Sequence, residues 1–134
     1  MSRVNKYRGI HTHILPQNEH LNGRWVYGYL ADENYINSPE LEGEFLVDKD
    51  TVGQYIGVND KNEKEVYEGD IVRNFLCIDD HGKPLYEYGK VVYNAEQIGF
   101  EIVDDEHNRI ATYVNLEVIG NVYENSDLLK EVEG

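Results

Sequence analysis

The sequence predicts a mainly β protein, and three observations support this prediction. Short runs rich in Val, Ile, Tyr, Phe and Trp recur along the chain, which is typical of half-buried strands. Polar clusters of Asn, Asp, Gly and Pro separate these runs, as expected for turns. Helical periodicity is nearly lacking. Strands of this length and spacing favour a short-stranded antiparallel barrel or roll with very little helix.

The strand candidates follow one another at close spacing. Ala31 to Glu44 is acidic and is predicted to be a loop, because Asn37-Ser38-Pro39 interrupts any regular element. Ser126 is predicted to cap one short C-terminal helix. The predicted strands are a short one within Val4 to Ile14, then Arg24 to Leu30, Phe45 to Val47, Tyr55 to Val58, Val66 to Tyr67, Ile71 to Ile78, Tyr86 to Asn94, Gly99 to Val103, Arg109 to Val114 and Glu117 to Tyr123.

The centre of the chain combines strands with two turn signals. Asn59 to Lys64 holds no apolar residue and is predicted to form a hairpin loop of about four to six residues. At the next reversal, Gly69 can adopt a positive φ, and the Asp70 carboxylate can accept backbone N–H groups. We interpret Gly69 and Asp70 as turn residues and not as part of a site.

The central segment also carries a family resemblance. Gln54 to Asn74, QYIGVNDKNEKEVYEGDIVRN, resembles the signature of the YopX family of phage and prophage proteins. Lys6 to Gly9, Gly23 to Leu30 and Val118 to Asn125 are similar to further family blocks, so the resemblance covers most of the chain. The opening differs from that of many family members, which start with a Lys-Phe-Arg-Ala-Trp-like segment. In this chain, His11 to Pro16 comes after the Arg8-Gly9 pair instead. The resemblance implies a phage accessory protein with an SH3-like barrel towards the C-terminal side and no established activity.

Length and composition limit the number of domains and the cellular compartment that can be expected. The length of 134 residues predicts one domain, 1–134, either undivided or built from two β subdomains, 1–52 and 53–134. The resemblance implies that this domain is YopX-like and that the second subdomain, 53–134, is an SH3-like barrel. Cys77 is the single cysteine, which excludes an intramolecular disulfide and favours the reducing cytoplasm of a bacterial host. We expect neither a signal peptide nor a membrane span. Cys77 lies in an apolar run and is expected to be a buried small hydrophobe and not a nucleophile.

The charge balance is strongly acidic. The chain has 26 acidic and 12 basic residues, a formal net charge of −14. Such a field repels nucleic acid and anionic membranes, so neither is expected as a partner. Arg3, Lys6 and Arg8 form the nearest basic group, and we interpret them as solvated residues near a terminus.

No pattern predicts a catalytic, cofactor-binding or metal-binding residue. His11 and His13 would share one face of a strand, but no further ligand follows at zinc spacing. Asp79-Asp80-His81 and Asp104 to Asn108 are predicted to be solvent-facing loops. The glycines form neither a phosphate-binding loop nor a dinucleotide-binding motif. We therefore expect a protein without enzyme activity and without a cofactor.

An aromatic stripe offers two readings. Trp25, Tyr27 and Tyr29 alternate along one predicted strand and share a face. They could form a platform for stacking a ligand, as in base-binding β proteins, or they could fill the core. Because the chain has few Phe residues to fill the interior, the core is favoured.

Together these observations favour a binding module. The 11 tyrosines provide amphipathic contact area, and the negative field suits docking onto a basic protein surface. We expect a protein partner and a homo-oligomer formed through an exposed strand edge or a Tyr-rich face. One alternative is an acidic mimic of nucleic acid that occupies a host nucleic-acid-binding protein. Another is a small enzyme or nucleic-acid-binding module whose site the sequence does not reveal.

Overall fold

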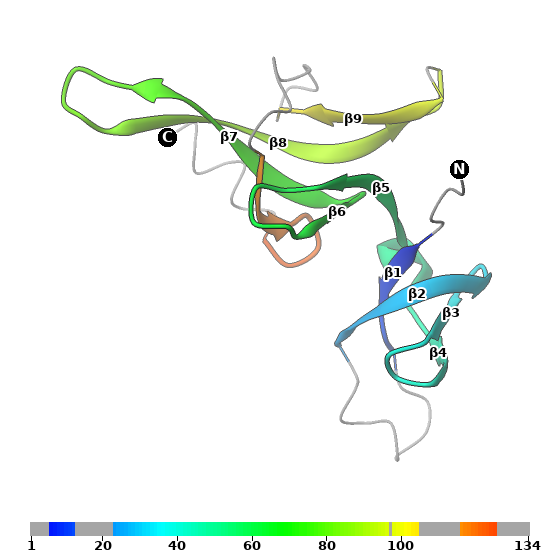
Figure 1. The fold of residues 1–134 in the computed structure, drawn as a ribbon. Helices are drawn as coiled ribbons and strands as arrows, with labels where there is room; N and C mark the ends of the chain where they lie inside the picture. Colours follow the sequence, from blue (N-terminus) through cyan, green and yellow to red (C-terminus); the bar gives the residue numbers. More distant parts are fainter. Residues whose placement is uncertain (1–5, 13–22, 97, 105–115, 126–134) are drawn as a thin grey trace. The chain divides into compact units, whose positions relative to one another are not determined.

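The computed structural model describes residues 6–12, 23–96, 98–104 and 116–125. Within them the chain forms antiparallel strands and one turn of 3-10 helix, so the predicted mainly β class with very little helix is confirmed (Figure 1). The elements are β1 (Tyr7–Ile10), β2 (Trp25–Asp32), β3 (Tyr35–Ser38), β4 (Gly43–Leu46), η2 (Lys49–Thr51), β5 (Gly53–Asn59), β6 (Glu65–Tyr67), β7 (Asp70–Ile78), β8 (Pro84–Asn94), β9 (Gly99–Val103) and β10 (Glu117–Asn121).

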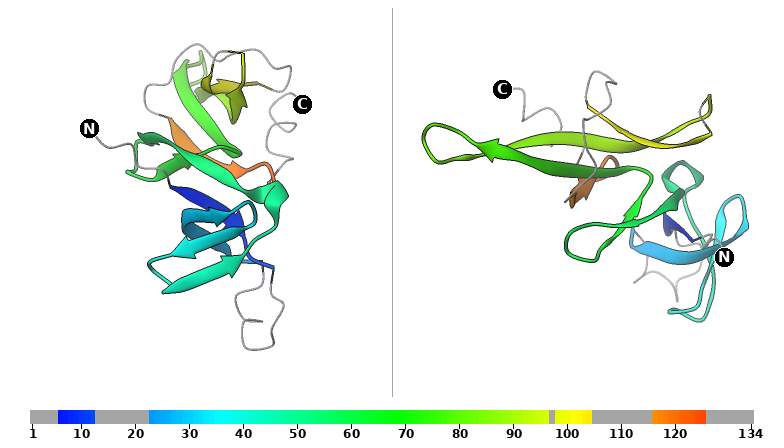
Figure 2. Two further views of the ribbon diagram at one scale, coloured as in Figure 1. Left: turned by 90° about the vertical axis from the view of Figure 1, so that its right-hand side faces the viewer. Right: turned by 45° about the horizontal axis from the view of Figure 1, so that its top comes forward.

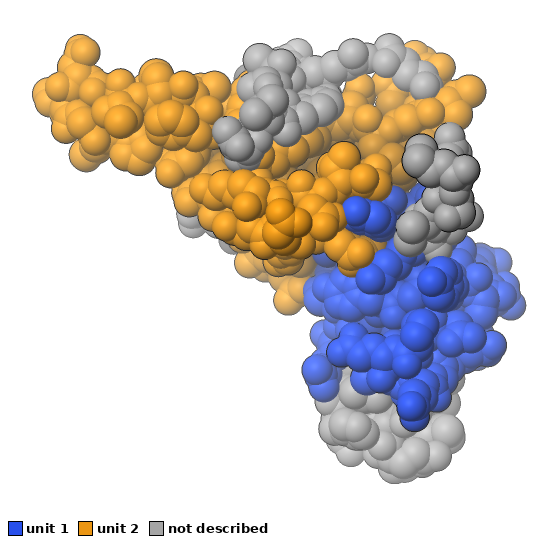
Figure 3. Space-filling view, in the orientation of Figure 1, with its two compact units in different colours: residues 1–55 blue, residues 56–134 orange. Residues whose placement is uncertain are grey.

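The chain divides into two compact units, residues 1–55 and residues 56–134 (Figure 3). The boundary falls inside β5. Each unit has a hydrophobic cluster of its own. The predicted strand Arg109 to Val114 and the helix predicted at Ser126 lie outside the described residues.

Unit 1 is a sheet in the order β4-β3-β2-β1, with the start of β5 beside β1. One face buries Val26, Ile36 and Val47, which form its core. Gly28 allows β2 and β3 to approach, because a Cβ there would lie 2.0 Å from the carbonyl oxygen of Asn37. The core is therefore built from small aliphatic side chains and close backbone contact.

The loop predicted for Ala31 to Glu44 is wrong in part, because β3 forms inside it and β4 begins there. Along β3 the side chains alternate, with Ile36 and Ser38 buried and their neighbours exposed. Burial of Ile36 against Val26 and Val47 outweighs the weak local preference of this polar segment for a strand. Pro39 follows the last residue of β3, so it limits the strand without preventing it.

Unit 2 contains a four-stranded antiparallel sheet in the order β10-β7-β8-β9 and the hairpin of β5 and β6 (Figure 2). Its core is made of Val66, Val72, Val91, Ile102 and Leu116. The described strands do not close into a barrel, so the SH3-like barrel that the resemblance implies is not completed by them. Of the predicted forms, a roll is compatible with this arrangement.

The two turns of the central segment form as predicted. In the first, Asp60 donates its backbone N–H to the carbonyl of Lys64 at 2.7 Å and closes the β5–β6 hairpin. In the second, Gly69 has a φ of 93°, and the Asp70 carboxylate accepts the backbone N–H of Tyr67 at 2.8 Å. Asp70 is buried, so its role in the turn agrees with the interpretation of these residues as structural.

Candidate functional site

A buried carboxylate fastens the first turn to the last strand of unit 2. Asp60 Oδ1 accepts the backbone N–H groups of Asn62 and Lys64 at 2.8 and 2.9 Å, and Oδ2 accepts that of Val118 on β10 at 2.9 Å. Burial alone would raise the pKa of Asp60, but these three backbone donors, aided by the Lys64 charge, hold it below its usual value. Asp60 is thus an ionised anchor for β10.

A second polar cluster lies where β7 leaves β10. Arg73 Nε donates to Glu117 Oε1 at 2.6 Å, and Lys61 Nζ lies 3.8 Å from the same oxygen. The Arg73 guanidinium also covers the ring of Tyr86 on β8, 4.1 Å from its centroid. The hydrogen bond to Glu117 is the main cause that raises the pKa of Arg73. This cluster holds three strands together.

His11, which was considered as a metal ligand, packs inside unit 1 and bonds to its backbone. His11 is buried, and its Nδ1 lies 2.5 Å from the carbonyl oxygen of Leu46, an acceptor, so Nδ1 carries the proton. Its ring meets that of Phe45 edge to face, with the centroids 5.5 Å apart. His13 lies outside the described residues. Nowhere in the described ranges do three His, Cys, Asp or Glu side chains gather as metal ligands would.

The preference for Trp25, Tyr27 and Tyr29 as core residues was wrong in part. They share a face of β2, as predicted, but the fully buried residues are Val26 and Gly28 between them, whereas Trp25 and Tyr27 are half-buried and Tyr29 is 54% exposed. The guanidinium of Arg8, itself buried, lies 4.4 Å from the centroid of the Trp25 ring. The stripe is therefore a partly exposed aromatic face of unit 1.

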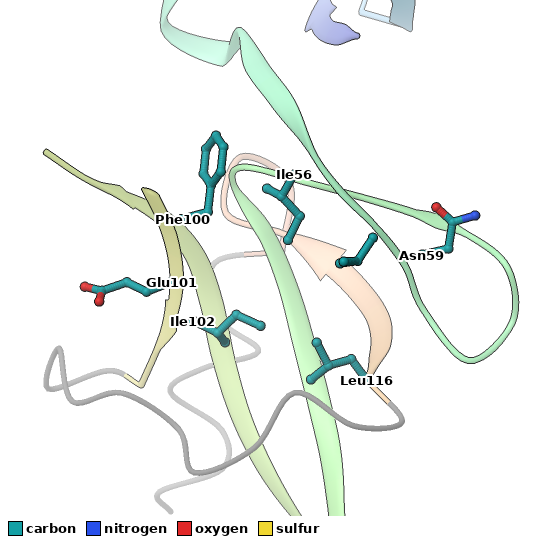
Figure 4. Close-up of a pocket in the computed structure, with 7 residues that line it drawn as sticks. Ile56, Asn59, Phe100, Glu101, Ile102 and Leu116 are labelled. Atoms are coloured by element: carbon teal, nitrogen blue, oxygen red, sulfur yellow. The ribbon is translucent and has the colours of Figure 1, made fainter. Parts of the chain in front are cut away.

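A small cavity opens in unit 2 between β5 and β9 (Figure 4). It has a volume of about 280 Å³ and mostly apolar walls that adjoin the core. Both polar side chains of its lining bond to neighbours, since Asn59 donates to the carbonyl of Glu63 and Glu101 accepts from Asn94. The lining residues are Ile56, Val58, Asn59, Phe100, Glu101, Ile102 and Leu116. This cavity offers apolar contact and not acid–base chemistry.

Several exposed apolar side chains gather on the outer half of the β7–β8 hairpin, residues 74–87, which we call the arm. β10 pairs with β7 only as far as Arg73, and β9 pairs with β8 only from Lys90 onwards. Among the described residues, the arm is therefore a two-stranded ribbon, and it stands clear of the sheet of unit 2 in Figures 1 and 2. Its exposed apolar side chains are Phe75, Leu76, Cys77, Ile78 and Leu85.

The tip of the arm is a polar turn closed by hydrogen bonds. Asp79 Oδ1 accepts the backbone N–H groups of His81 and Lys83 at 2.8 and 2.9 Å. The solvent-facing loop predicted at Asp79-Asp80-His81 is confirmed. Of the second acidic loop, only Asp104 lies within the described residues.

Cys77 is exposed, so its predicted burial was wrong. The apolar run Phe75 to Ile78 was interpreted as interior because its residues suit a core strand. No sequence signal separates the arm from a core strand, because four consecutive apolar residues put apolar side chains on both faces, which is typical of a strand buried on both sides. No other described strand of this sheet flanks the arm. The side chains of the neighbouring residues Phe75 and Leu76 are both exposed.

The fold and this site define a class: a small, mainly antiparallel β protein with an exposed apolar hairpin. Comparison with known families then places it further. The sequence profile of the YopX protein family matches residues 6–130, nearly the whole chain, and the chain belongs to that family. A search among curated proteins finds no match. In the part of the chain that the structure describes, no helix has the length and apolar character of a membrane span.

Proposed function

We propose that the protein is a phage or prophage accessory protein that acts as a non-catalytic binding module, engages a protein partner and self-associates. The observation that carries this proposal is the exposed arm. Contiguous exposed apolar side chains mark interaction sites in soluble proteins. A two-stranded ribbon is also marginally stable in water by itself, so a bound surface would stabilise it.

Charge selects the kind of external partner. The chain carries −14, and the arm ends in Asp79 and Asp80. A basic protein surface with an apolar centre would match this distribution, and long-range attraction would speed its association. Association of that kind slows between low and physiological salt, because the screening length falls to about 8 Å. The single exposed thiol, Cys77, suits a reducing bacterial cytoplasm as the place of action.

The test is a capture experiment with matched variants. Tagged protein is recovered from host cells during prophage induction, with and without nuclease, and its bound proteins are identified by mass spectrometry. We compare an arm variant, Leu76→Thr with Ile78→Thr, with an aromatic-face variant, Tyr29→Thr, which removes an equally exposed side chain from unit 1. Threonine keeps the strand preference of all three positions.

We expect to recover a basic protein that stays bound after nuclease treatment. The Tyr29→Thr variant should still capture this protein, and the arm variant should not. Loss with Tyr29→Thr alone would move the contact to the aromatic face and overturn the assignment to the arm. Recovery of a nucleic-acid-binding protein, released when loop carboxylates are neutralised, would favour the acidic mimic instead. Turnover of a substrate, abolished by one side-chain change, would overturn the binding function itself.

A further inference from the structure

We propose that the aromatic face of unit 1 binds an arginine side chain from a basic protein segment, above Asn37 and between Glu44 and the tyrosines of β2. This inference goes beyond the proposed function, because the site lies on unit 1 and does not involve the arm. It adds a second contact, the chemical group that this contact recognises and the residues that recognise it.

The first support is an arrangement that unit 2 fills with an arginine of its own. Glu117 of β10, Arg73 of β7 and Tyr88 of β8 lie side by side across three antiparallel strands. Arg73 donates to Glu117 at 2.6 Å, and its guanidinium covers Tyr86, the ring two residues before Tyr88. This row therefore shows what a guanidinium contacts when it lies between a glutamate and a strand with two alternate tyrosines.

Unit 1 contains the same row without the arginine. Glu44 of β4, Asn37 of β3 and Tyr29 of β2 lie side by side across three antiparallel strands. Tyr27 is two residues before Tyr29, as Tyr86 is before Tyr88. All three residues of the row are exposed. Because an asparagine side chain is much shorter than an arginine side chain, the place of the guanidinium is open to one from another molecule.

The second support is a further arginine on the same face. Arg8 of β1 pairs with Tyr27 of β2, and its guanidinium lies over Trp25, two residues before Tyr27. Arg8 and Arg73 thus each cover the ring two residues before their direct partner. By the same geometry, a guanidinium beside Tyr29 covers Tyr27. It approaches from the β3 side of β2, whereas Arg8 lies on the β1 side.

The third support is charge. The segment from β2 to β4, residues 25–46, contains five acidic residues and no lysine or arginine. The faces of aromatic rings are also negative, so the tyrosines and the acidic segment favour a cation together. A planar guanidinium can stack on a ring while it donates to a carboxylate, and an ammonium cannot match both. A basic segment that contains arginine is therefore the partner that fits.

A single contact of this kind is weak, because exposed ion pairs and exposed cation–π pairs change affinity by about three- to tenfold. It does not by itself retain a protein during capture, and a partner held by the arm stays bound in Tyr29→Thr. The contact is therefore measured directly, with a short peptide as the probe.

The test is an NMR titration of the full chain, at physiological salt, with three capped pentapeptides. Each has four glycines around a central arginine, lysine or citrulline, and citrulline has the shape of arginine without its charge. We expect the arginine peptide to shift the amide signals of β2 to β4. Its dissociation constant should be about threefold lower than that of the lysine peptide and about tenfold lower than that of the citrulline peptide.

Variants of exposed residues locate the site. Asn37→Arg should abolish the shifts, because it fills the row from within, as Arg73 does in unit 2. Glu44→Gln should raise the dissociation constant of the arginine peptide about threefold. Leu41→Arg is the matched control: it adds the same charge at an exposed position between β3 and β4, and it should change the dissociation constant by less than about twofold.

Three results overturn the inference. These are equal affinities for the three peptides, undiminished binding in Asn37→Arg, and an equal loss in Asn37→Arg and Leu41→Arg, which would show an effect of charge alone. None of them bears on the arm, whose partner is tested by capture. A failed capture, in turn, leaves the preference for the arginine peptide and its loss in Asn37→Arg as expected here.

Discussion

The two halves of the β7–β8 hairpin contrast sharply although one pair of strands forms both. In the near half, β10 and β9 flank the hairpin, and Ile71, Val72 and Val91 are buried. In the far half, no described strand flanks it, and Phe75, Leu76, Ile78 and Leu85 are exposed. The residue types are similar, so the difference comes from the neighbouring strands. Apolar side chains stabilise the fold where another layer covers them and remain available for binding where none does.

The greatest predicted change in the free energy of unfolding comes from comparing two isoleucines on β7. Ile71 is 0% exposed and Ile78 is 61% exposed. Ile71→Ala should lower the free energy of unfolding by about 4 kcal/mol, because it leaves a cavity in a packed layer. Ile78→Ala should lower it by less than about 0.5 kcal/mol when measured on dilute monomer, because little packing is lost. Denaturant unfolding measures both, and equal losses would break the comparison.

The near half depends on β10, which Asp60 anchors through Val118. Asp60→Ala should cost about 3 kcal/mol at neutral pH, because it leaves buried backbone donors without their charged acceptor. Since the pKa of Asp60 is lowered in the folded protein, its contribution is complete above about pH 4 and is lost as the pH falls through the lower folded value.

The control for Asp60 is Asp60→Asn, which keeps one oxygen acceptor but does not titrate. In both variants, the free energy of unfolding should fall less below pH 4 than it does in the wild-type protein, because Asp60 no longer takes up a proton there. The measurement is urea unfolding at a series of pH values. An unchanged acid profile in both variants would show that Asp60 does not anchor β10 as an ion.

The smallest predicted effect lies at the junction between the halves. Arg73 bonds to Glu117 on β10 and covers the ring of Tyr86 at the base of the arm. Arg73→Lys should cost about 1 kcal/mol, because an ammonium cannot keep both the directed bond and the planar contact. Hydrogen exchange should then quicken in Phe75 to Ile78 more than in Ile71 and Val72. Equal acceleration in both halves would show that the junction does not separate them.

Much of the fold was predictable from local chemistry. Residues 59–64 contain only polar side chains, and the turn that they form follows from that composition. Gly69 likewise occupies a position with positive φ that glycine adopts without strain. The alternation of Trp25, Tyr27 and Tyr29 with Val26 and Gly28 predicted which residues share a face. In each of these cases the relevant interactions lie within a few residues along the chain.

The errors share a different cause, which is that burial depends on segments far apart in sequence. The face of β2 that lies inside was decided by Ile36 and Val47, with which Val26 packs. β3 forms within an acidic segment because Ile36 packs against Val26 and Val47 in that core. Cys77 was expected inside and lies outside, in the part of the β7–β8 hairpin that neither β10 nor β9 flanks.

The β class, the turns, the acidic charge and the apolar character of Phe75 to Ile78 follow from local sequence alone. The tertiary structure decided which apolar residues form the two cores and which form the arm. The physical reason is that strand preference and turn chemistry are local properties, whereas burial is a property of pairs of surfaces. The same four residues, Phe75 to Ile78, would form a core strand beneath a covering layer and are exposed without one.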